Sequence, residues 1–185
     1  TGTEIVETGN ENIKWETTTQ TDFGMDLSLW DDRLSIIADY YIKRTDDILV
    51  RVPLPQSAGA FTPPYVNAGT VENKGLEFAL GTINTTGDFK WRTDFNISLN
   101  KNKVLELDYT EVYYFGRIYS NNQDVSIVRA GLPLGVFYGY ISEGVDEETG
   151  DLIYKDYNEN GMFDPGDRTI IGDGNPDFTY GFTNT

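Results

Sequence analysis

The sequence predicts an all-β fold of long antiparallel hairpins that form a partial section of a transmembrane β-barrel. Apolar and polar residues alternate with a period of two along most of the 185 residues, and short polar turns separate the alternating runs. The runs exceed the globular strand length of about five or six residues. They match the roughly 9 to 11 residues that a tilted strand needs to cross a bilayer.

The first hairpin is expected around a tight turn at residues 30–32, whose sequence is Trp-Asp-Asp. One face on either side of this turn is apolar, with Phe23, Met25, Leu27 and Leu29 before it and Leu34, Ile36, Ala38, Tyr40 and Ile42 after it. Ile37 and Tyr41 are exceptions, because they fall among the polar residues of the opposite face. Two alternating runs about a short polar turn predict a long β-hairpin.

A second hairpin is expected around residues 84–88, which include a glycine that can adopt positive φ. Its apolar face comprises Leu76, Phe78 and Leu80 before the turn and Phe89, Trp91, Thr93, Phe95, Ile97 and Leu99 after it. Long loops are expected at 52–67 and after Val104, and further strands at 136–141 and from Phe178 onward. Short turns at one end and long loops at the other are typical of outer-membrane barrels.

About six strands cannot close a plugged transporter barrel, which needs about 22. We therefore expect residues 1–185 to form one partial β-barrel domain. An inserted loop rich in Asp, Asn and Gly is expected at residues 145–175.

The composition excludes several classes of function. Acidic residues outnumber basic ones 30 to 14, which argues against nucleic acid as a partner, since phosphates are neutralised by clustered Lys and Arg. The chain has no Cys and no His, so it cannot build a disulfide, a thiolate metal site or a Ser-His-Asp or Cys-His catalytic site alone. We expect no enzyme activity. No apolar run is long enough for a transmembrane helix, and the mean hydropathy of −0.43 fits strands whose two faces differ.

One loop carries metal-binding chemistry. Residues 156–167 fit the twelve-residue EF-hand calcium loop, in which alternate positions supply oxygen ligands to a hard cation. The predicted calcium ligands are Asp156, Asn158, Asn160, the backbone carbonyl of Met162, Asp164 and Asp167. Gly161 would make the sharp turn, and Asp167 stands where the full motif has Glu. The alternative is a polar turn held by its own side-chain-to-backbone hydrogen bonds. Counting strands from the turn at 30–32 would place this loop at the short-turn end, but one strand missed in the count reverses the result, so the sequence leaves the side open.

An aromatic patch after Val104 offers a second candidate site. Tyr113, Tyr114, Phe115 and Tyr119 could stack on a glycan or peptide ligand at the mouth of a pore. The alternative is an interfacial aromatic belt, which is common in outer-membrane barrels.

Five strings in the sequence resemble the SusC/RagA family of TonB-dependent outer-membrane transporters. They lie at residues 14–18, 39–55, 67–77, 131–140 and 171–182, the last containing Asn175-Pro176-Asp177-Phe178. The resemblance covers nearly the whole chain but matches only the later part of the family's barrel, and it implies that residues 1–185 include no plug domain and no closing C-terminal strand. It implies energy-coupled uptake of glycan or peptide fragments across the outer membrane of a Gram-negative, Bacteroidetes-like bacterium. It also implies contact of the apolar face with membrane lipid, and partnership of the full-length protein with TonB and a SusD-like surface lipoprotein.

Two other readings compete with the transporter. One is a secreted, calcium-dependent β-sandwich that binds carbohydrate, and the other is an enzyme fragment. The sandwich differs in a checkable way: its apolar strand faces would be buried against a second sheet, whereas barrel strands expose theirs.

Overall fold

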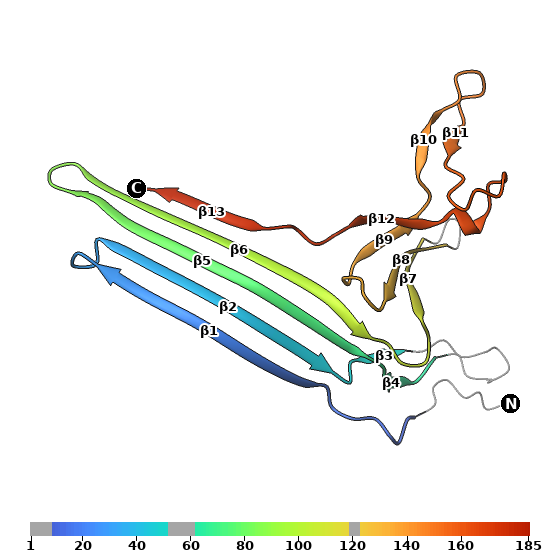
Figure 1. The fold of residues 1–185 in the computed structure, drawn as a ribbon, viewed down its shortest axis with the longest axis horizontal. Coiled ribbons are helices and arrows are strands. Elements are labelled where there is room, and N and C mark those ends of the chain that lie inside the picture. Colours follow the sequence, from blue (N-terminus) through green and yellow to red (C-terminus); the bar gives the residue numbers. More distant parts are fainter. Residues whose placement is uncertain (1–8, 52–61, 119–122) are drawn as a thin grey trace, which may run out of the picture.

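A five-stranded antiparallel sheet dominates the computed structural model, which describes residues 9–51, 62–118 and 123–185. The strand order is β1-β2-β5-β6-β13, and the strands run side by side in Figure 1. Their bounds are β1 Thr17–Leu29, β2 Leu34–Asp46, β5 Thr70–Thr86, β6 Lys90–Glu106 and β13 Thr179–Asn184. The predicted all-β fold of long antiparallel hairpins is confirmed, and the sheet is open, as a partial barrel requires.

The register gathers the predicted apolar residues on one continuous face of this sheet. Residues paired directly across antiparallel strands share a face. One row of paired residues runs through Leu27, Ile36, Leu80, Phe95 and Phe182, and the neighbouring row through Met25, Ala38, Phe78, Ile97 and Tyr180. We call the side of the sheet that carries these rows the apolar face, and the other side the polar face.

The apolar face is open to the surroundings. Phe23 is 66% exposed and Phe182 is 60% exposed, although both are large apolar side chains. Within the described residues, no second sheet packs on this face. The β-sandwich reading, which requires such a sheet, is therefore not favoured. No helix in the described part of the chain is long and apolar enough to cross a membrane.

The two ends of the sheet differ. The β1–β2 turn at Trp30, Asp31 and Asp32, all with positive φ, lies at the same end as the β5–β6 turn. Long excursions leave from the opposite end, here called the excursion end. The connection from β2 to β5 carries the hairpin of β3 (Leu49–Arg51) and β4 (Tyr65–Asn67).

The connection from β6 to β13 is the larger excursion and contains most of the remaining structure. A four-stranded sheet with the order β12-β9-β8-β7 and a projecting hairpin, β10–β11, both lie here (Figure 1). Their bounds are β7 Val112–Ile118, β8 Gln123–Arg129, β9 Val136–Gly139, β10 Ser142–Val145, β11 Leu152–Tyr154 and β12 Thr169–Asp173. A single 3-10 turn, Pro165–Asp167, precedes β12.

A small core joins the two sheets at the excursion end. Val104 near the end of β6 is fully buried. Its backbone N–H donates to the Leu132 carbonyl, and its carbonyl accepts a hydrogen bond from the Gly131 N–H, both just after the end of β8. Among the described residues, the other buried apolar side chains are Ala68, Val71, Ile127 and Val136. The long strands thus carry almost none of the conventional core, as expected for strands that meet lipid on one face.

Two sequence expectations need correction. The stretch after Val104, expected to be a long loop, contains β7 and β8, and the strand expected at 136–141 is β9 of the second sheet. The strand count from the turn at 30–32 puts the 156–167 loop at the short-turn end only if every expected strand belongs to the long sheet. Because β7 to β12 belong to the excursion and add no strands to the long sheet, the loop lies at the excursion end.

Candidate functional site

The apolar face has the dimensions of a lipid-facing band. From Phe89 in the turn to Leu99 of β6, the apolar positions cover about 34 Å at ~3.4 Å per residue. A strand tilt of ~40° reduces this to a height of about 26 Å, close to the ~25 Å apolar band of outer-membrane barrels. Beyond the band, toward the excursion end, the same face becomes charged with Arg44, Glu72, Lys74, Lys101 and Lys103.

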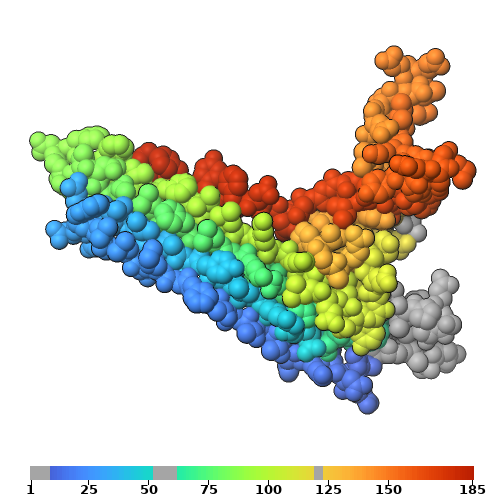
Figure 2. All heavy atoms as spheres, in the orientation of Figure 1, coloured from blue at the N-terminus to red at the C-terminus, as the bar shows by residue number. Residues whose placement is uncertain are grey.

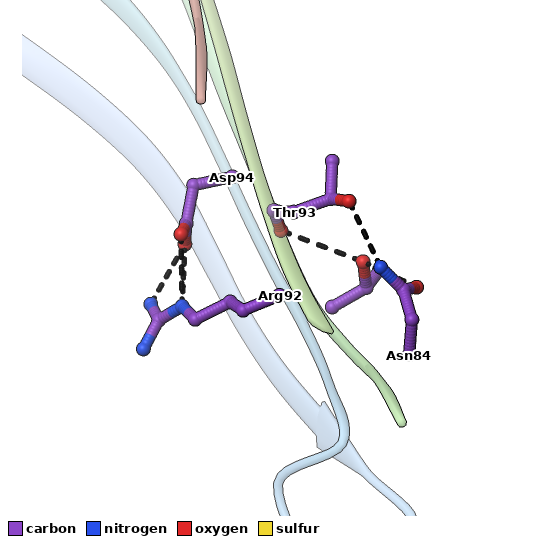
Figure 3. A network of polar contacts seen from close by, with 5 residues as sticks. Asn84, Arg92, Thr93 and Asp94 are labelled. Atoms are coloured by element: carbon purple, nitrogen blue, oxygen red, sulfur yellow. Dashed lines mark hydrogen bonds and ion pairs between the residues drawn. The ribbon is translucent and has the colours of Figure 1, made fainter. Parts of the chain in front are cut away.

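At the turn end, the apolar face finishes in a chain of hydrogen bonds around a tryptophan. The Trp91 indole N–H donates to Asn184 Oδ1 at 3.2 Å, and Thr93 Oγ1 donates to the same oxygen at 2.7 Å. Asn84 Nδ2 donates in turn to Thr93 Oγ1 at 2.9 Å, as Figure 3 shows. These side chains satisfy one another, and an amphipathic indole with a polar partner is typical of a membrane–water interface.

The same stretch of β6 presents a different chemistry to the other side. Figure 3 shows Arg92 and Asp94 projecting away from Thr93, toward the polar face. The guanidinium of Arg92 donates to both carboxylate oxygens of Asp94, at 2.7 and 2.8 Å. Both side chains are exposed, at 61% and 40%, as expected on a side of the strand that faces solvent.

On the polar face, a glycine of β5 leaves room for a tyrosine side chain of β2 to lie across the sheet. The Tyr41 hydroxyl reaches from β2 across β5 and donates to Asn100 Oδ1 on β6 at 3.1 Å. The ring passes directly over Gly75, where an added Cβ would lie 2.3 Å from Tyr41 Cζ. Tyr41 therefore lies on the polar face although it is aromatic, and the missing side chain at Gly75 leaves the room that its ring occupies. Ile37, the other exception, lies on the polar face between Asp26 and Ala79.

The loop at residues 156–167 is closed by its own carboxylates. Asp156 accepts backbone N–H bonds from Asn160 at 3.1 Å and from Gly161 at 2.6 Å. Asp167 accepts from Tyr157 at 2.9 Å and from Asp164 at 2.8 Å, so it joins the two ends of the loop. Gly161 has φ of +82°, as the predicted sharp turn requires.

Asp167 is the centre of this loop. It is 1% exposed, and the hydrogen bond from the Asp164 backbone N–H, aided by those from Asn158 and Tyr157, holds its pKa below the usual value although burial alone would raise it. Asp164 and Asp167 also cap each other's backbone around the 3-10 turn. The loop is thus stabilised in the way that the polar-turn alternative predicts.

The loop has the oxygen-bearing side chains that a cation would need, but these side chains form hydrogen bonds within the loop. Asn160 Nδ2, for example, donates to Asp164 Oδ2 at 2.7 Å. Within the described ranges, no three carboxylate, imidazole or thiol side chains converge on one point as metal ligands. Calcium binding by Asp156, Asn158, Asn160, Met162, Asp164 and Asp167 stays a prediction.

The aromatic patch does not form a single platform. Tyr113, Tyr114 and Phe115 are consecutive residues of β7, so Tyr114 points to the opposite side from the other two. Burial raises the pKa of Tyr113, whose hydroxyl donates to the backbone carbonyl of Asp108 at 2.9 Å. The Tyr114 ring packs against Tyr138 with centroids 5.9 Å apart. Tyr119 lies outside the described residues. A ligand-stacking role for the patch stays a prediction.

Arg168 connects several strands of the excursion, although nothing in the sequence pattern singles it out. Its guanidinium donates to the backbone carbonyls of Asp124 and Tyr138, the latter at 3.0 Å. It also lies 4.5 Å from the centre of the Tyr138 ring. One arginine, directly after the buried Asp167, thus ties β12 to β8 and β9. An isolated Arg beside an acidic loop carries no periodicity or motif by which this role could be predicted.

An open sheet of long strands, with a lipid-sized apolar face, an indole at its rim and a polar opposite face, defines a section of a transmembrane β-barrel wall. Residues 1–166 match the family described as TonB dependent receptor-like, beta-barrel. The chain belongs to this family, and the resemblance seen in the sequence is confirmed.

Relatives and solved structures agree with this assignment. TonB-dependent receptor P3 of Formosa agariphila is 37% identical over 201 residues, covering 99% of this chain and 20% of that protein. TonB-dependent receptor SusC of Bacteroides thetaiotaomicron is 33% identical, over 94% of this chain and 18% of that protein. The structure of the RagAB peptide transporter matches with a TM-score of 0.78 and 26% identity, over 95% of this chain and 19% of that one. The chain spans about a fifth of the length of the curated relatives it matches.

Proposed function

We propose that this chain is a section of the barrel wall of a TonB-dependent nutrient transporter in the outer membrane of a Bacteroidetes-like bacterium. The continuous apolar face across five strands is the observation that carries the proposal. In water, a face of this size would be a strong aggregation liability, whereas lipid covers it without a second sheet. The role is transport rather than catalysis, in keeping with the family.

The orientation follows from the two ends of the sheet. Outer-membrane barrels have short turns on the periplasmic side and long loops outside the cell. The turn at Trp30 would therefore face the periplasm, and the excursion with β7 to β12 would face the exterior. The polar face, with Tyr41, Asn100 and Asp94, would line the lumen.

Energy coupling through TonB, glycan or peptide fragments as substrate, and a SusD-like surface lipoprotein as partner belong to the same proposal. The family assignment supports TonB, and the likeness to SusC and to the RagAB peptide transporter supports uptake together with a partner. These are properties of the complete transporter, of which this chain would supply wall and exterior loops.

A cysteine scan along β5 tests the orientation of the wall, in a complete transporter from which any cysteine outside this cysteine-free chain has been removed. In the complete transporter reconstituted in lipid nanodiscs, a spin label at Phe78→Cys or Leu80→Cys should collide readily with oxygen, which concentrates in hydrocarbon. Labels at Glu77→Cys and Ala79→Cys should not. Equal oxygen accessibility at all four positions, or protection of the even-numbered pair by protein, would contradict the proposed wall.

A further inference from the structure

The β10–β11 hairpin stands away from the rest of the molecule. It projects from the excursion as an isolated two-stranded element, and Figures 1 and 2 show its tip reaching well beyond the neighbouring sheet. All seven strand residues of the hairpin, Ser142–Val145 and Leu152–Tyr154, are exposed. Two-stranded hairpins are marginally stable by themselves, so an ordered one that exposes apolar residues calls for a reason.

The tip of the hairpin is pre-organised. The Asp146 carboxylate accepts the backbone N–H groups of Glu148 at 2.8 Å and Thr149 at 3.0 Å, and these bonds lower its pKa. The backbone closes with Asp146 N–H donating to the Asp151 carbonyl and Gly150 N–H donating to the Asp146 carbonyl, both at 2.8 Å. The hairpin is therefore held in one shape before any partner arrives, which lowers the entropy lost on binding.

One face of the hairpin carries a continuous apolar strip. Val145 and Leu152 pair across the two strands, and Tyr154 follows on the same face. Tyr154 stacks on Phe163 of the 156–167 loop, with ring centroids 4.7 Å apart and planes 13° apart. Tyr140 packs against both rings at the base of the hairpin. We call Val145, Leu152, Tyr154 and Phe163 the apolar strip. Leu152 remains 54% exposed and Phe163 56% exposed.

Lipid is a poor explanation for this strip. The hairpin lies at the excursion end, beyond the charged residues that close the apolar face, so it is outside the band that hydrocarbon would cover. The hairpin and the adjacent loop that carry the strip are rich in acidic residues: Glu143, Asp146, Glu147, Glu148 and Asp151 on the hairpin, and Asp156, Glu159 and Asp164 on the loop. Such a surface is repelled by anionic headgroups.

A second copy of this chain is also a poor partner. Two identical acidic hairpins brought together would place like charges opposite each other, which disfavours the contact. The complementary surface is a protein patch with an apolar centre and a basic rim. In such an interface, the apolar strip would supply the desolvated anchors, and the acidic tip would steer the encounter.

We infer that the β10–β11 hairpin is a docking element, and that its apolar strip binds an apolar, basic-rimmed patch on the surface lipoprotein that accompanies the transporter. The choice of the lipoprotein as occupant rests on the proposed function. The hairpin itself assigns the chemistry of the contact: Leu152 and Phe163 enter the partner's apolar patch, and Glu147 and Glu148 face its basic rim.

Two substitutions in β11 provide a matched test. Leu152 and its neighbour Ile153 are both exposed aliphatic residues, but Ile153 lies on the opposite face, paired with Gly144. In the complete transporter, purified and titrated with the purified lipoprotein, Leu152→Asn should weaken binding about tenfold, as expected for one lost apolar anchor. Ile153→Asn should change it by less than about twofold, because it removes nothing from the strip. Equal effects of the two substitutions would overturn the inference.

Hydrogen exchange on the unmodified transporter gives a second measurement that does not depend on a variant folding. Backbone amides between Ser142 and Tyr154 should become protected when the lipoprotein is added. Protection that is already complete in the transporter alone would mean that its own loops or a second copy cover the strip, and would overturn the inference. A correctly inserted transporter that binds no lipoprotein at all would instead refute the partner in the proposed function.

Discussion

A cation placed in the centre of the apolar face provides a sharp test of the barrel-wall assignment. Leu80 lies in the middle of the long sheet, between Ile36 of β2 and Phe95 of β6 on the same face. Leu80→Arg would project a guanidinium into the hydrocarbon, far from either end of the strand. Ala79→Arg, one residue away, would project the same group from the polar face, between Ile37 and Asn96.

The size of the effect follows from depth. An arginine on the lipid face costs about 2–4 kcal/mol at the bilayer midplane and about 0–1 kcal/mol near the interface. Leu80→Arg should therefore shift the folding equilibrium by about 30-fold to 700-fold, at 1.4 kcal/mol for each factor of ten. Phe89→Arg, at the turn end of the same face, should cost about 0–1 kcal/mol. Ala79→Arg should be tolerated to a similar extent, because its side chain meets water or polar protein.

The assay is the denaturant midpoint for folding of the complete transporter into lipid vesicles, followed by the shift in gel mobility that accompanies barrel formation. The expected order of destabilisation is Leu80→Arg, then Phe89→Arg and Ala79→Arg close to the parent protein. If Ala79→Arg were as damaging as Leu80→Arg, the two faces would be equally buried in protein and the reasoning from lipid contact would be refuted.

Three further predictions concern single features of the structure. Gly75→Ala should displace the Tyr41 ring and break its bond to Asn100, lowering stability by about 1 kcal/mol in denaturant melts; in a chain that already carries Tyr41→Ser, and so lacks this bond, Gly75→Ala should cost little more. Because the pKa of Asp167 is lowered in the folded protein, its carboxylate stabilises the fold above the usual pKa of 3.8, and this stability is lost as the pH falls through the folded pKa. Limited proteolysis of the loop should therefore accelerate at low pH, and Asp167→Asn should remove that pH dependence. Calcium should raise the melting temperature and Asp156→Ala should abolish the increase; melting curves that neither calcium nor a chelator changes would exclude the site.

The period of two predicted the faces of the long sheet almost residue by residue. It succeeded because a strand whose two faces meet different surroundings must alternate. Four of the five strands of the long sheet also belong to two hairpins with short turns, so the alternation continues across each turn. The bulge in β5 near Asn84 was not predicted, since an extra residue in one strand leaves no mark in composition. Tyr41 stood out in the sequence as an irregularity. Its reason, a glycine on the adjacent strand, could be recognised only from the register.

The excursion was predicted much less well, for a physical reason. Strands β7 to β12 are short, packed partly on one another and partly exposed, so they carry no long alternation. The 156–167 loop was found from its oxygen-rich spacing, which a carboxylate-closed polar turn and a calcium loop share. Arg168 and the aromatic contacts of Tyr140 depend on residues distant in sequence, which no local pattern reveals.

The direct pairing of β6 with β13 has an evolutionary consequence. These strands are neighbours in the sheet although the whole larger excursion separates them along the chain. Insertions and deletions between Glu106 and Thr179 therefore leave the strand register untouched, at an entropic cost that grows only slowly with loop length. Duplicated genes that keep this wall could exchange or lengthen the exterior segment freely. New recognition surfaces could then arise on a membrane scaffold that natural selection holds nearly constant.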